Sequence, residues 1–368
     1  MIYILGSTLN TVGGSIRFIL DLIFILQEKG FEVATILTQK TNWNFVKKFL
    51  SPPTVPPNKE YFIIPFDLPF FGLYQRLFAE EFLKLIKKKL SKDDVVIGSL
   101  GTFTPTIVDI NYVHGVTSGH ILSQYKHSLR RIYYHPYRMA TAKTEDYLRH
   151  QCEIKTIANS EYTKQKLGKI GIKNVKVIYP PICAPVYFMG LNCERKNQVV
   201  MVSRATAGKG LDDFVEASQR LPDVSFVLIC FALPAEYGKI RELIKEAPKN
   251  LSVKWNLSVI DRLKLIWESK VFLSLARGEH FGSTVLESAV AGCTPIIYPE
   301  GGVLEILNDV NHFKATTCDE AVRQIERAIN SWDLEMAKRR SYNLSLKFGF
   351  YRFSEEIIPE IEQCRRAG

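Results

Sequence analysis

The chain has 368 residues, of which 46% are hydrophobic, and a formal net charge of +10. This length predicts two domains rather than one core, and the hydrophobic share is ample to fill both. No run approaches the ~18 uninterrupted apolar residues of a membrane span, and the N-terminus has neither the charged leader nor the cleavage site of a secretory signal. Seven cysteines without Cys-x-x-Cys pairs favour reduced thiols, so we expect a cytoplasmic protein.

Short apolar runs bounded by turns alternate with helical stretches along the whole chain. This alternation predicts an α/β protein with parallel sheets made of β-α-β units. The expected strands of the first half are residues 2–5, 32–37, 61–65, 94–98, 107–113, 154–158 and 175–178. Those of the second half are residues 198–203, 224–230, 251–255, 271–275 and 294–298. The two groups predict one Rossmann-like sheet in each half.

The best candidate for a linker is Tyr179-Pro-Pro-Ile-Cys-Ala-Pro185, because its prolines break regular structure. We therefore expect one domain at residues 1–185 and a second at residues 186–348. The last stretch, residues 349–368, has aromatic residues followed by an amphipathic helical pattern.

Two adjacent glycines, Gly13 and Gly14, follow the first expected strand and precede a helix expected at residues 16–29. Glycines let a backbone approach a ligand closely, and the N–H groups at a helix start point back at that ligand. An ordinary tight turn explains a Gly-Gly pair equally well. The Gly-x-Gly-x-x-Gly pattern is absent, which argues against a dinucleotide-dependent oxidoreductase.

His114 follows the strand-like run 107–113 and precedes Gly115. It is therefore expected at the carboxyl end of a strand, where open α/β sheets place their ligands. A neutral imidazole there can bond a hydroxyl group. A loop histidine satisfied by neighbouring protein groups is an equally good reading.

The positive charge lies in one half of the chain. Residues 1–185 carry 24 Lys and Arg against 14 Asp and Glu, whereas residues 186–368 carry 24 of each kind. Within the basic half, residues 61–90 combine many aromatic side chains with a run of lysines. Such a segment suits an anionic membrane surface, and a solvated helix face over a buried aromatic core fits it equally well.

Two cations, Arg204 and Lys209, fall in a loop between an expected strand and an amphipathic helix. They can meet a diphosphate and stabilise the charge that grows on it as a glycosyl bond breaks. Solvated surface cations are the alternative. Because the chain shows no Asp-x-Asp motif, we expect the two cations and a helix start to replace a metal ion.

Two acids, Glu279 and Glu287, stand eight positions apart where an apolar strand leads through a loop into a helix. Gly282, Ser283 and Thr284 lie in that loop, and the free N–H groups and the positive dipole end of the helix start that follows favour phosphate. The first acid can lie by a reacting sugar and the second can accept bonds from sugar hydroxyls. The alternative is structural, because Thr284 and Glu287 have the spacing of a capping box.

The stretch from Glu279 to Glu287, with Ser288-Ala-Val-Ala-Gly-Cys-Thr-Pro295 after it, resembles the Glu-x7-Glu signature of the retaining GT-B glycosyltransferases of family 4. Further elements that resemble the family are Arg204…Lys209-Gly210, Gly13-Gly14, His114-Gly115, Asn159-Ser160 and Tyr179-Pro-Pro. The resemblance covers nearly the whole chain and is strongest from Val199 to Pro299.

The resemblance implies two Rossmann-like domains that face each other across a cleft. It implies an acceptor-binding domain at residues 1–185, a nucleotide-sugar domain at residues 186–348, and a terminal helix at about 349–368 that crosses back to the first domain. The implied reaction moves a hexose from a nucleotide-diphosphate sugar to an acceptor hydroxyl with retention of configuration, without cofactor or metal. The implied acceptor is a glycan, with a lipid-linked or membrane-associated one suggested by residues 61–90.

The resemblance also assigns roles to single residues. It implies catalytic roles for Glu279 and His114, which lie beside the transferred sugar, and a contact of Glu287 with the ribose. The residues implied at the diphosphate are Arg204, Lys209, Gly13, Gly14, Gly282 and Ser283. Those implied at the donor sugar are His280 and Phe281.

One departure from the family concerns the nucleotide base. Between Trp255 and Asp261 the family often has a glycine after a strand, whereas this chain has Asn256-Leu-Ser. The base, and with it the donor, therefore stays open. Other functions also remain open: an epimerase or phosphorylase of the same fold, a catalytically inactive scaffold, or a non-catalytic nucleic-acid or anion binder, as a pI near 9.1 would allow.

Overall fold

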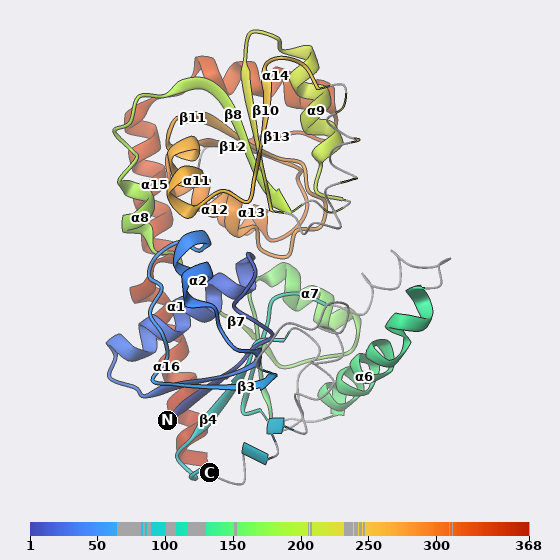
Figure 1. The fold of residues 1–368 in the computed structure, drawn as a ribbon, viewed down its shortest axis with the longest axis vertical. Coiled ribbons are helices and arrows are strands. Elements are labelled where there is room, and N and C mark those ends of the chain that lie inside the picture. The colour runs from blue at the N-terminus through green and yellow to red at the C-terminus, as the bar shows by residue number, and fades with distance from the viewer. Residues whose placement is uncertain are drawn as a thin grey trace. The chain divides into compact units, whose positions relative to one another are not determined.

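The computed structural model describes residues 1–64, 82–83, 85–86, 90–100, 108–116, 130–150, 153–204, 206, 208–231, 238, 242, 245, 247–308, 310 and 312–367. The chain divides into two compact units (Figure 1). The N-terminal unit consists of Met1–Val46, Pro53–Pro181 and Phe350–Gly368, and the C-terminal unit of Lys47–Pro52 and Ile182–Gly349. Each unit is built on one parallel sheet.

In the described residues, the sheet of the N-terminal unit has seven parallel strands. In chain order they are β1 (Ile2–Leu5), β2 (Val33–Gln39), β3 (Lys59–Ile64), β4 (Val95–Gly98), β5 (Ile110–Val113), β6 (Lys155–Ala158) and β7 (Val175–Val177). Their order across the sheet is β3-β2-β1-β4-β5-β6-β7. The inner strand β1 is buried along its whole length, with Ile2 opposite Val33 and Val95. Because both faces of such strands are covered, they appear in the sequence as continuous apolar runs.

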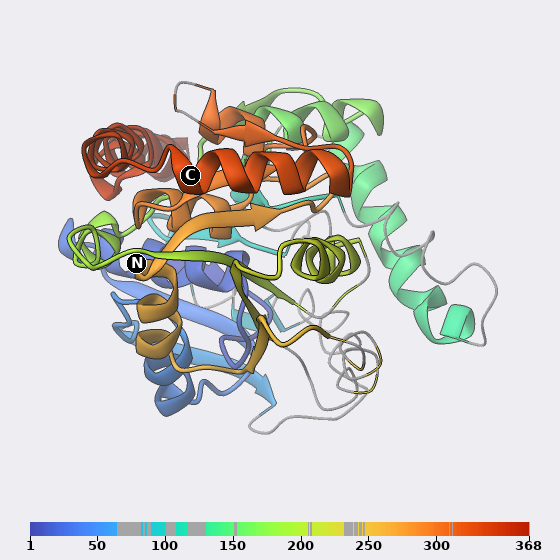
Figure 2. The same ribbon diagram turned by 90° about the horizontal axis from the view of Figure 1, so that it is seen from above.

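The N-terminal unit contains the helices α1 (Gly14–Glu28), α6 (Arg130–His150), α7 (Glu161–Lys169) and α16 (Phe350–Ala367). A further helix, α2 (Trp43–Phe49), follows β2. In both views α6 extends away from the sheet of this unit (Figure 1, Figure 2). Its described buried side chains, Thr144 and Leu148 among them, lie in its C-terminal half.

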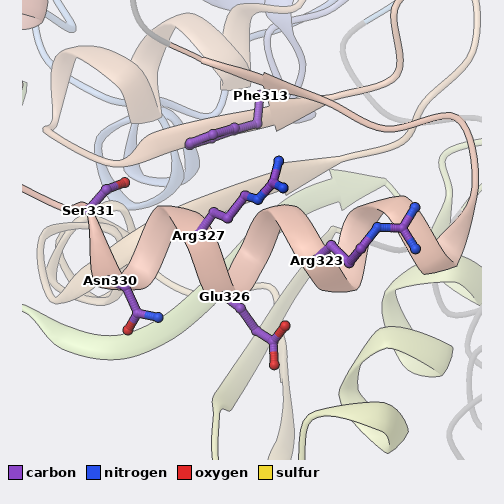
Figure 3. A pocket seen from close by; sticks show the side chains of 6 residues that line it. All are labelled: Phe313, Arg323, Glu326, Arg327, Asn330 and Ser331. Carbon is purple, nitrogen blue, oxygen red and sulfur yellow. The ribbon is translucent and has the colours of Figure 1, made fainter.

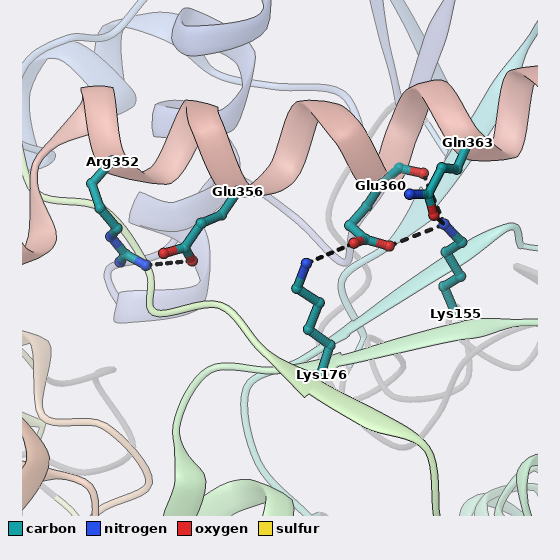
Figure 4. A network of polar contacts seen from close by, with 6 residues as sticks. All are labelled: Lys155, Lys176, Arg352, Glu356, Glu360 and Gln363. Carbon is teal, nitrogen blue, oxygen red and sulfur yellow. Dashed lines mark hydrogen bonds and ion pairs between the residues drawn. The ribbon is translucent and has the colours of Figure 1, made fainter.

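The terminal helix α16 is fastened to the N-terminal unit by a polar network (Figure 4). Glu360 accepts hydrogen bonds from Lys155 on β6, at 3.0 Å, and from Lys176 on β7, at 2.7 Å. Burial alone would raise the pKa of Glu360, but the hydrogen bonds from both lysines outweigh it and lower this pKa. The ring of Phe353 packs edge-on against Phe18 of α1, at 5.8 Å between centroids. The helix therefore belongs to the first unit by apolar and ionic contacts alike.

In the described residues, the sheet of the C-terminal unit has six parallel strands, in the order β10-β9-β8-β11-β12-β13. Their bounds are β8 (Lys196–Arg204), β9 (Ser225–Phe231), β10 (Leu251–Trp255), β11 (Ser269–Ser274), β12 (Thr294–Ile297) and β13 (Phe313–Lys314). The helices are α8 (Ala184–Phe188), α9 (Leu211–Arg220), α11 (Val259–Trp267), α12 (Ser283–Val290), α13 (Val303–Leu307), α14 (Cys318–Asn330) and α15 (Leu334–Phe348). Helices α9 and α14 contact each other, and α12 packs against α8 and α15.

The observed architecture confirms the predicted α/β class with two Rossmann-like parallel sheets. Every strand expected from the apolar runs is present, with ends that differ by three residues at most. The sequence did not predict β13, because a strand of two residues is too short to leave a pattern.

The basic and aromatic segment at residues 61–90 lies largely outside the described residues. Its described part begins with Tyr61–Ile64 at the end of β3 and includes Leu83, which is buried. The predicted membrane surface on this segment therefore stays a prediction. In the part of the chain that the structure describes, no helix is long and apolar enough to cross a membrane.

Candidate active site

The loop after β11 enters α12 through a glycine that the geometry requires. Gly282 is the N-cap of α12 and has a φ of 95°, in the left-handed region that glycine favours. A Cβ atom at this position would also clash with the side chain of Val303. Because Gly282 has no side chain, α12 begins without a side-chain cap hydrogen bond. Its first-turn N–H groups are thus offered at the carboxyl end of the sheet.

The capping-box alternative for Glu287 is wrong. In a capping box Thr284 would be the N-cap, but α12 already begins at Ser283 and Gly282 caps it. Thr284 therefore lies inside the helix, and Glu287 lies beyond its first turn, where its side chain is half-buried. The position of Glu287 is not explained by helix capping.

A second glycine pair holds the loop that carries Glu279. The N–H of Gly302 donates to the carbonyl of Glu279 at 2.8 Å, and Gly301 forms a parallel bridge with Glu279. Gly301 has a φ of 103°, and a Cβ atom on either glycine would clash with the backbone of Glu279 or His280. Sequence reasoning missed this pair, although two adjacent glycines after a strand are the same signal that drew attention to Gly13 and Gly14.

Lys209 and Glu279 meet as an ion pair. The Nζ of Lys209 lies 2.5 Å from Oε2 of Glu279, and the two side chains are 27% and 29% exposed. Gly210 lets the two residues come close. It is the N-cap of α9, with a φ of 72°, and because it has no side chain its backbone can lie against Leu275. The loop before α9 therefore lies directly on the end of β11. The structure thus brings together one residue predicted to bind the diphosphate and the predicted catalytic acid.

Arg204 is the last residue of β8, the strand next to β11 in the sheet. Its side chain is exposed, and its guanidinium group has no hydrogen bond or ion pair with the described residues. Of the two residues predicted at the donor sugar, His280 is half-buried, whereas Phe281 is buried and packs against Phe348 with the ring centroids 5.8 Å apart. Phe281 thus anchors the loop to the core, and its contact with a sugar stays a prediction.

Where the family often has a glycine near the nucleotide base, this chain has a residue in the left-handed region that glycine favours. Asn256 follows β10 with a φ of 45°. Asparagine is among the few residues besides glycine that adopt this left-handed region readily. The next helix, α11, then starts at Ser258, which accepts a hydrogen bond from the N–H of Asp261. The chain therefore makes a left-handed turn between β10 and α11 without a glycine.

In the N-terminal unit, His114 lies at the carboxyl end of β5, as its position in the sequence predicts. Its Nε2 is 2.8 Å from Oγ of Ser99, which follows β4, and Asn159 donates to its carbonyl at 3.1 Å. The residue keeps some exposed surface, but its ring is enclosed beside Phe18 and Tyr112. This burial lowers the pKa of His114 to about 3, so the imidazole is neutral. Sequence reasoning missed Ser99, because the contact joins two different strands.

Gly13 is the N-cap of α1, and Gly14 is its first residue. Gly13 has an extended backbone, with φ 174° and ψ 160°, and no side-chain cap. A Cβ atom there would meet nothing within 4 Å among the described residues. Neither strain nor crowding explains this glycine, in contrast to Gly282 and Gly301.

A separate hollow lies on the C-terminal unit between β13 and α14, with a volume of about 600 Å³ (Figure 3). It is lined by Phe313, Arg323, Glu326, Arg327, Asn330 and Ser331. None of these residues belongs to the predicted donor site. In the part of the chain that the structure describes, no group of three or more His, Cys, Asp or Glu side chains is placed to hold a metal ion.

Comparisons with known proteins bear on the family and the fold. Residues 190–345 match the protein-family model described as "Glycosyl transferases group 1". No curated protein matches the sequence. The fold is similar to that of sucrose-phosphate synthase from Thermosynechococcus elongatus, with a TM-score of 0.74 and 14% identity over 100% of this chain and 99% of that one.

Two further structures share the fold. Anabaena Alr3699/HepE, solved in complex with UDP and glucose, has a TM-score of 0.72 and 16% identity over 98% of this chain and 99% of that one. WaaG, a glycosyltransferase involved in lipopolysaccharide biosynthesis, has a TM-score of 0.66 and 14% identity over 99% and 98%. At such identities these structures establish the fold alone. Together with the family match, they identify residues 190–345 as a group 1 glycosyltransferase domain within a chain of GT-B fold.

Proposed function

We propose that the protein transfers a hexose from a nucleotide-diphosphate sugar to an acceptor hydroxyl with retention of anomeric configuration. The observation that carries the proposal is the cluster at the start of α12, where Glu279 and Lys209 form an ion pair beside a helix end without a side-chain cap. An acid for the sugar, a cation and open N–H groups for the phosphates are what this transfer needs. The C-terminal unit then binds the donor and the N-terminal unit binds the acceptor.

A UDP-hexose is the donor we propose to test first. Anabaena Alr3699/HepE, which shares the fold, was solved with UDP and glucose bound. Asn256 makes a left-handed turn after β10, where the family places the base, and this turn supports a nucleotide at this position. Glu287, which capping does not explain, would accept hydrogen bonds from the ribose hydroxyls.

In the proposed reaction the bond between the sugar C1 and the diphosphate oxygen breaks, and a bond from C1 to the acceptor oxygen forms on the same face. The leaving phosphate oxygen takes the proton of the acceptor hydroxyl, so no side chain has to act as base. Arg204, Lys209 and the N–H groups of α12 stabilise the negative charge on the leaving diphosphate, together with Gly13 and Gly14. These groups do the work of a metal ion, and no cofactor takes part.

His114 would assist as a neutral hydrogen-bonding group. Its lowered pKa, about 3, excludes a protonated imidazole at neutral pH. Because Ser99 occupies Nε2, the remaining nitrogen Nδ1 is the one that would bond a hydroxyl of the sugar or acceptor. Glu279, half-exposed in its loop, would contact the transferred sugar from the donor side.

For the acceptor we propose a lipid-linked or membrane-associated glycan, with the enzyme peripheral on the cytoplasmic face of a membrane. The support is the charge distribution, since residues 1–185 carry the whole positive excess. An anionic surface attracts such a domain. The group 1 family match favours transfer over a scaffold or a nucleic-acid binder.

The test is a panel of nucleotide sugars, with thermal stabilisation of the protein as the first measurement. A ligand that binds only the folded state raises the melting temperature, so we expect one UDP-sugar to do so more than the others. Candidate glycan acceptors are then added, and the anomeric configuration of the product is read by NMR. We expect release of nucleoside diphosphate and a new glycosidic bond that has the same anomeric configuration as the donor. A product epimerised at the sugar, or a free sugar phosphate, would instead show an epimerase or a phosphorylase.

A further inference from the structure

The ion pair between Lys209 and Glu279 joins two residues that the proposed function assigns to different parts of the donor. Lys209 is assigned to the diphosphate and Glu279 to the sugar. In the structure each is the partner of the other, with 2.5 Å between Nζ and Oε2. A bound donor would therefore have to separate the two residues, with Lys209 at its diphosphate and Glu279 at its sugar.

The two partners differ in how far they can move. The backbone of Glu279 is fixed by the bond from Gly302 and by the close approach of Gly301. Lys209 has a flexible four-carbon side chain and lies between Gly208 and Gly210, which have φ values of 80° and 72°. With 27% of its side chain exposed, the ammonium group remains within reach of a ligand. Exchange of partners is therefore expected on the lysine side.

Charge decides the direction of the exchange. A diphosphate carries several negative charges, so it binds an ammonium group more strongly than one carboxylate does. Two anionic groups held at the same ammonium also repel each other, which favours replacement of the carboxylate over sharing. Arg204, by contrast, has no ion-pair partner among the described residues, so none of these carboxylates competes with a diphosphate for it.

We propose that Glu279 is the internal counter-ion of Lys209, and that binding of the donor diphosphate displaces Glu279 and so frees its carboxylate for the sugar. This inference rests on the proposed function. It makes contact with the sugar conditional on the diphosphate, so a free sugar or a sugar without a diphosphate finds Glu279 already occupied. The same residue then serves both to bind the sugar and to select for an activated one.

The test is to measure binding of inorganic pyrophosphate and of UDP by calorimetry to the wild type and to Glu279→Gln. Glutamine keeps the size of the side chain and removes the competing charge. We therefore expect Glu279→Gln to bind pyrophosphate about twofold to fivefold more tightly than wild type, the range for a partly exposed ion pair. Glu287→Gln is the control for pyrophosphate, which has no ribose, and should not tighten its binding.

A double-mutant cycle separates competition from simple repulsion. Lys209→Met and the double variant Lys209→Met/Glu279→Gln are titrated with UDP, whose base and ribose keep binding measurable. If Glu279 competes for Lys209, Glu279→Gln has no effect in the Lys209→Met background. Equal tightening in both backgrounds, or no tightening in either, overturns the inference. A folded wild type that binds neither UDP nor pyrophosphate overturns the proposed function itself, and the inference with it.

Discussion

The helices of this protein begin in two different ways. Four of them, α7, α11, α14 and α15, start at a side chain that accepts a backbone N–H, namely Ser160, Ser258, Thr317 and Asp333. Three others of eight residues or more, α1, α9 and α12, start at Gly13, Gly210 and Gly282 and have no side-chain cap hydrogen bond. The five-residue helices α8 and α13 also lack one. The three longer uncapped helices coincide with the three motifs that resemble a donor site. No side chain occupies the N–H groups at their starts, which the proposed function assigns to phosphate.

The two ends of α12 differ in how their free backbone groups are satisfied. At its C-terminal end, side chains of the chain itself satisfy the last carbonyl groups. Arg195 donates to Ala291, Arg340 and Trp332 both donate to Gly292, and Ser341 donates to Val290. Two of these donors are cations, which also suit the negative end of the helix dipole. Side chains of the protein thus satisfy the carboxyl end, whereas no side chain caps the N-terminal end, which the proposed function assigns to the diphosphate.

The largest effect should come from Glu279→Gln, which removes the acid next to the open end of α12. We expect turnover to fall about a hundredfold or more, as when one preorganised electrostatic group is lost. The melting temperature should change little, because the pair with Lys209 is partly exposed. Turnover and melting temperature are measured on the same samples.

Glu287→Gln is the companion to that variant. Since Gly282 caps α12, Glu287 has no capping role, and the substitution should weaken donor affinity without lowering the melting temperature. A Glu287→Gln variant with wild-type donor affinity would contradict the ribose role.

The two cations are expected to matter next. Replacing Arg204 or Lys209 by Ala removes a charge-assisted bond of about 1.5–3 kcal/mol, so turnover should fall about tenfold to a hundredfold. Lys264→Ala, an exposed lysine on α11, is the control for charge alone and should leave turnover unchanged. Wild-type turnover in both Arg204→Ala and Lys209→Ala would show that these cations do not meet the diphosphate.

The sequence predicted the sheets well because buried parallel strands must be apolar on both faces, which leaves continuous runs. It placed Lys209 and Glu279 at carboxyl ends of strands, but it did not show that they form an ion pair, because residues 70 positions apart are brought together by the fold alone. For the same reason the bond between Ser99 and His114 was not predictable.

The sequence was ambiguous where one pattern fits two geometries. The Thr-x-x-Glu spacing at Thr284 and Glu287 is that of a capping box, yet the backbone at Gly282 sets the helix start two residues earlier. Conversely, Asn256 stands where the family often has a glycine, and it adopts the left-handed region that glycine favours. Both cases depend on a φ angle, which residue identity alone does not fix.

Gly13→Ser tests the comparison between the two kinds of helix start directly. Gly13 has φ 174° and ψ 160°, close to the φ −165° and ψ 160° of the N-cap Ser160, so a serine can cap α1 as Ser160 caps α7. We expect the free energy of unfolding to rise by a few tenths of a kcal/mol. The Michaelis constant for the donor should rise about tenfold, because the serine hydroxyl takes an N–H meant for phosphate.

The reverse change at a capped helix is the control for Gly13→Ser. Asp333→Gly removes the cap of α15, so stability should fall by a few tenths of a kcal/mol while the donor constant stays unchanged. A donor constant that does not respond to Gly13→Ser would mean that the open start of α1 has no ligand.

A smaller effect concerns the pH dependence that His114 gives to the N-terminal unit. The pKa of His114 is about 3 in the folded protein, against about 6.5 in an unfolded chain. Between these values only the unfolded chain binds the proton, so stability is lost as the pH falls from about 6.5 towards 3. His114→Asn should lose less of its melting temperature than wild type between about pH 7 and about pH 4.5. Equal losses would show that the imidazole is not held neutral by burial.

The smallest effect is expected from metal removal, and it bears on what the open helix starts are for. If the N–H groups of α12 and the cations Arg204 and Lys209 neutralise the leaving diphosphate, a divalent ion has no charge left to balance. EDTA should therefore leave turnover close to that of the untreated enzyme, with the Michaelis constant for the donor unchanged.

The Lys209→Ala variant, measured beside the wild type, makes this test more sensitive. Added Mg²⁺ that restores part of the variant's activity, but does not change the wild type, would show that the lysine stands where another enzyme places a metal. Loss of wild-type turnover in EDTA, restored by Mg²⁺ or Mn²⁺, would mean that the open N–H groups and the two cations do not carry the charge of the diphosphate by themselves.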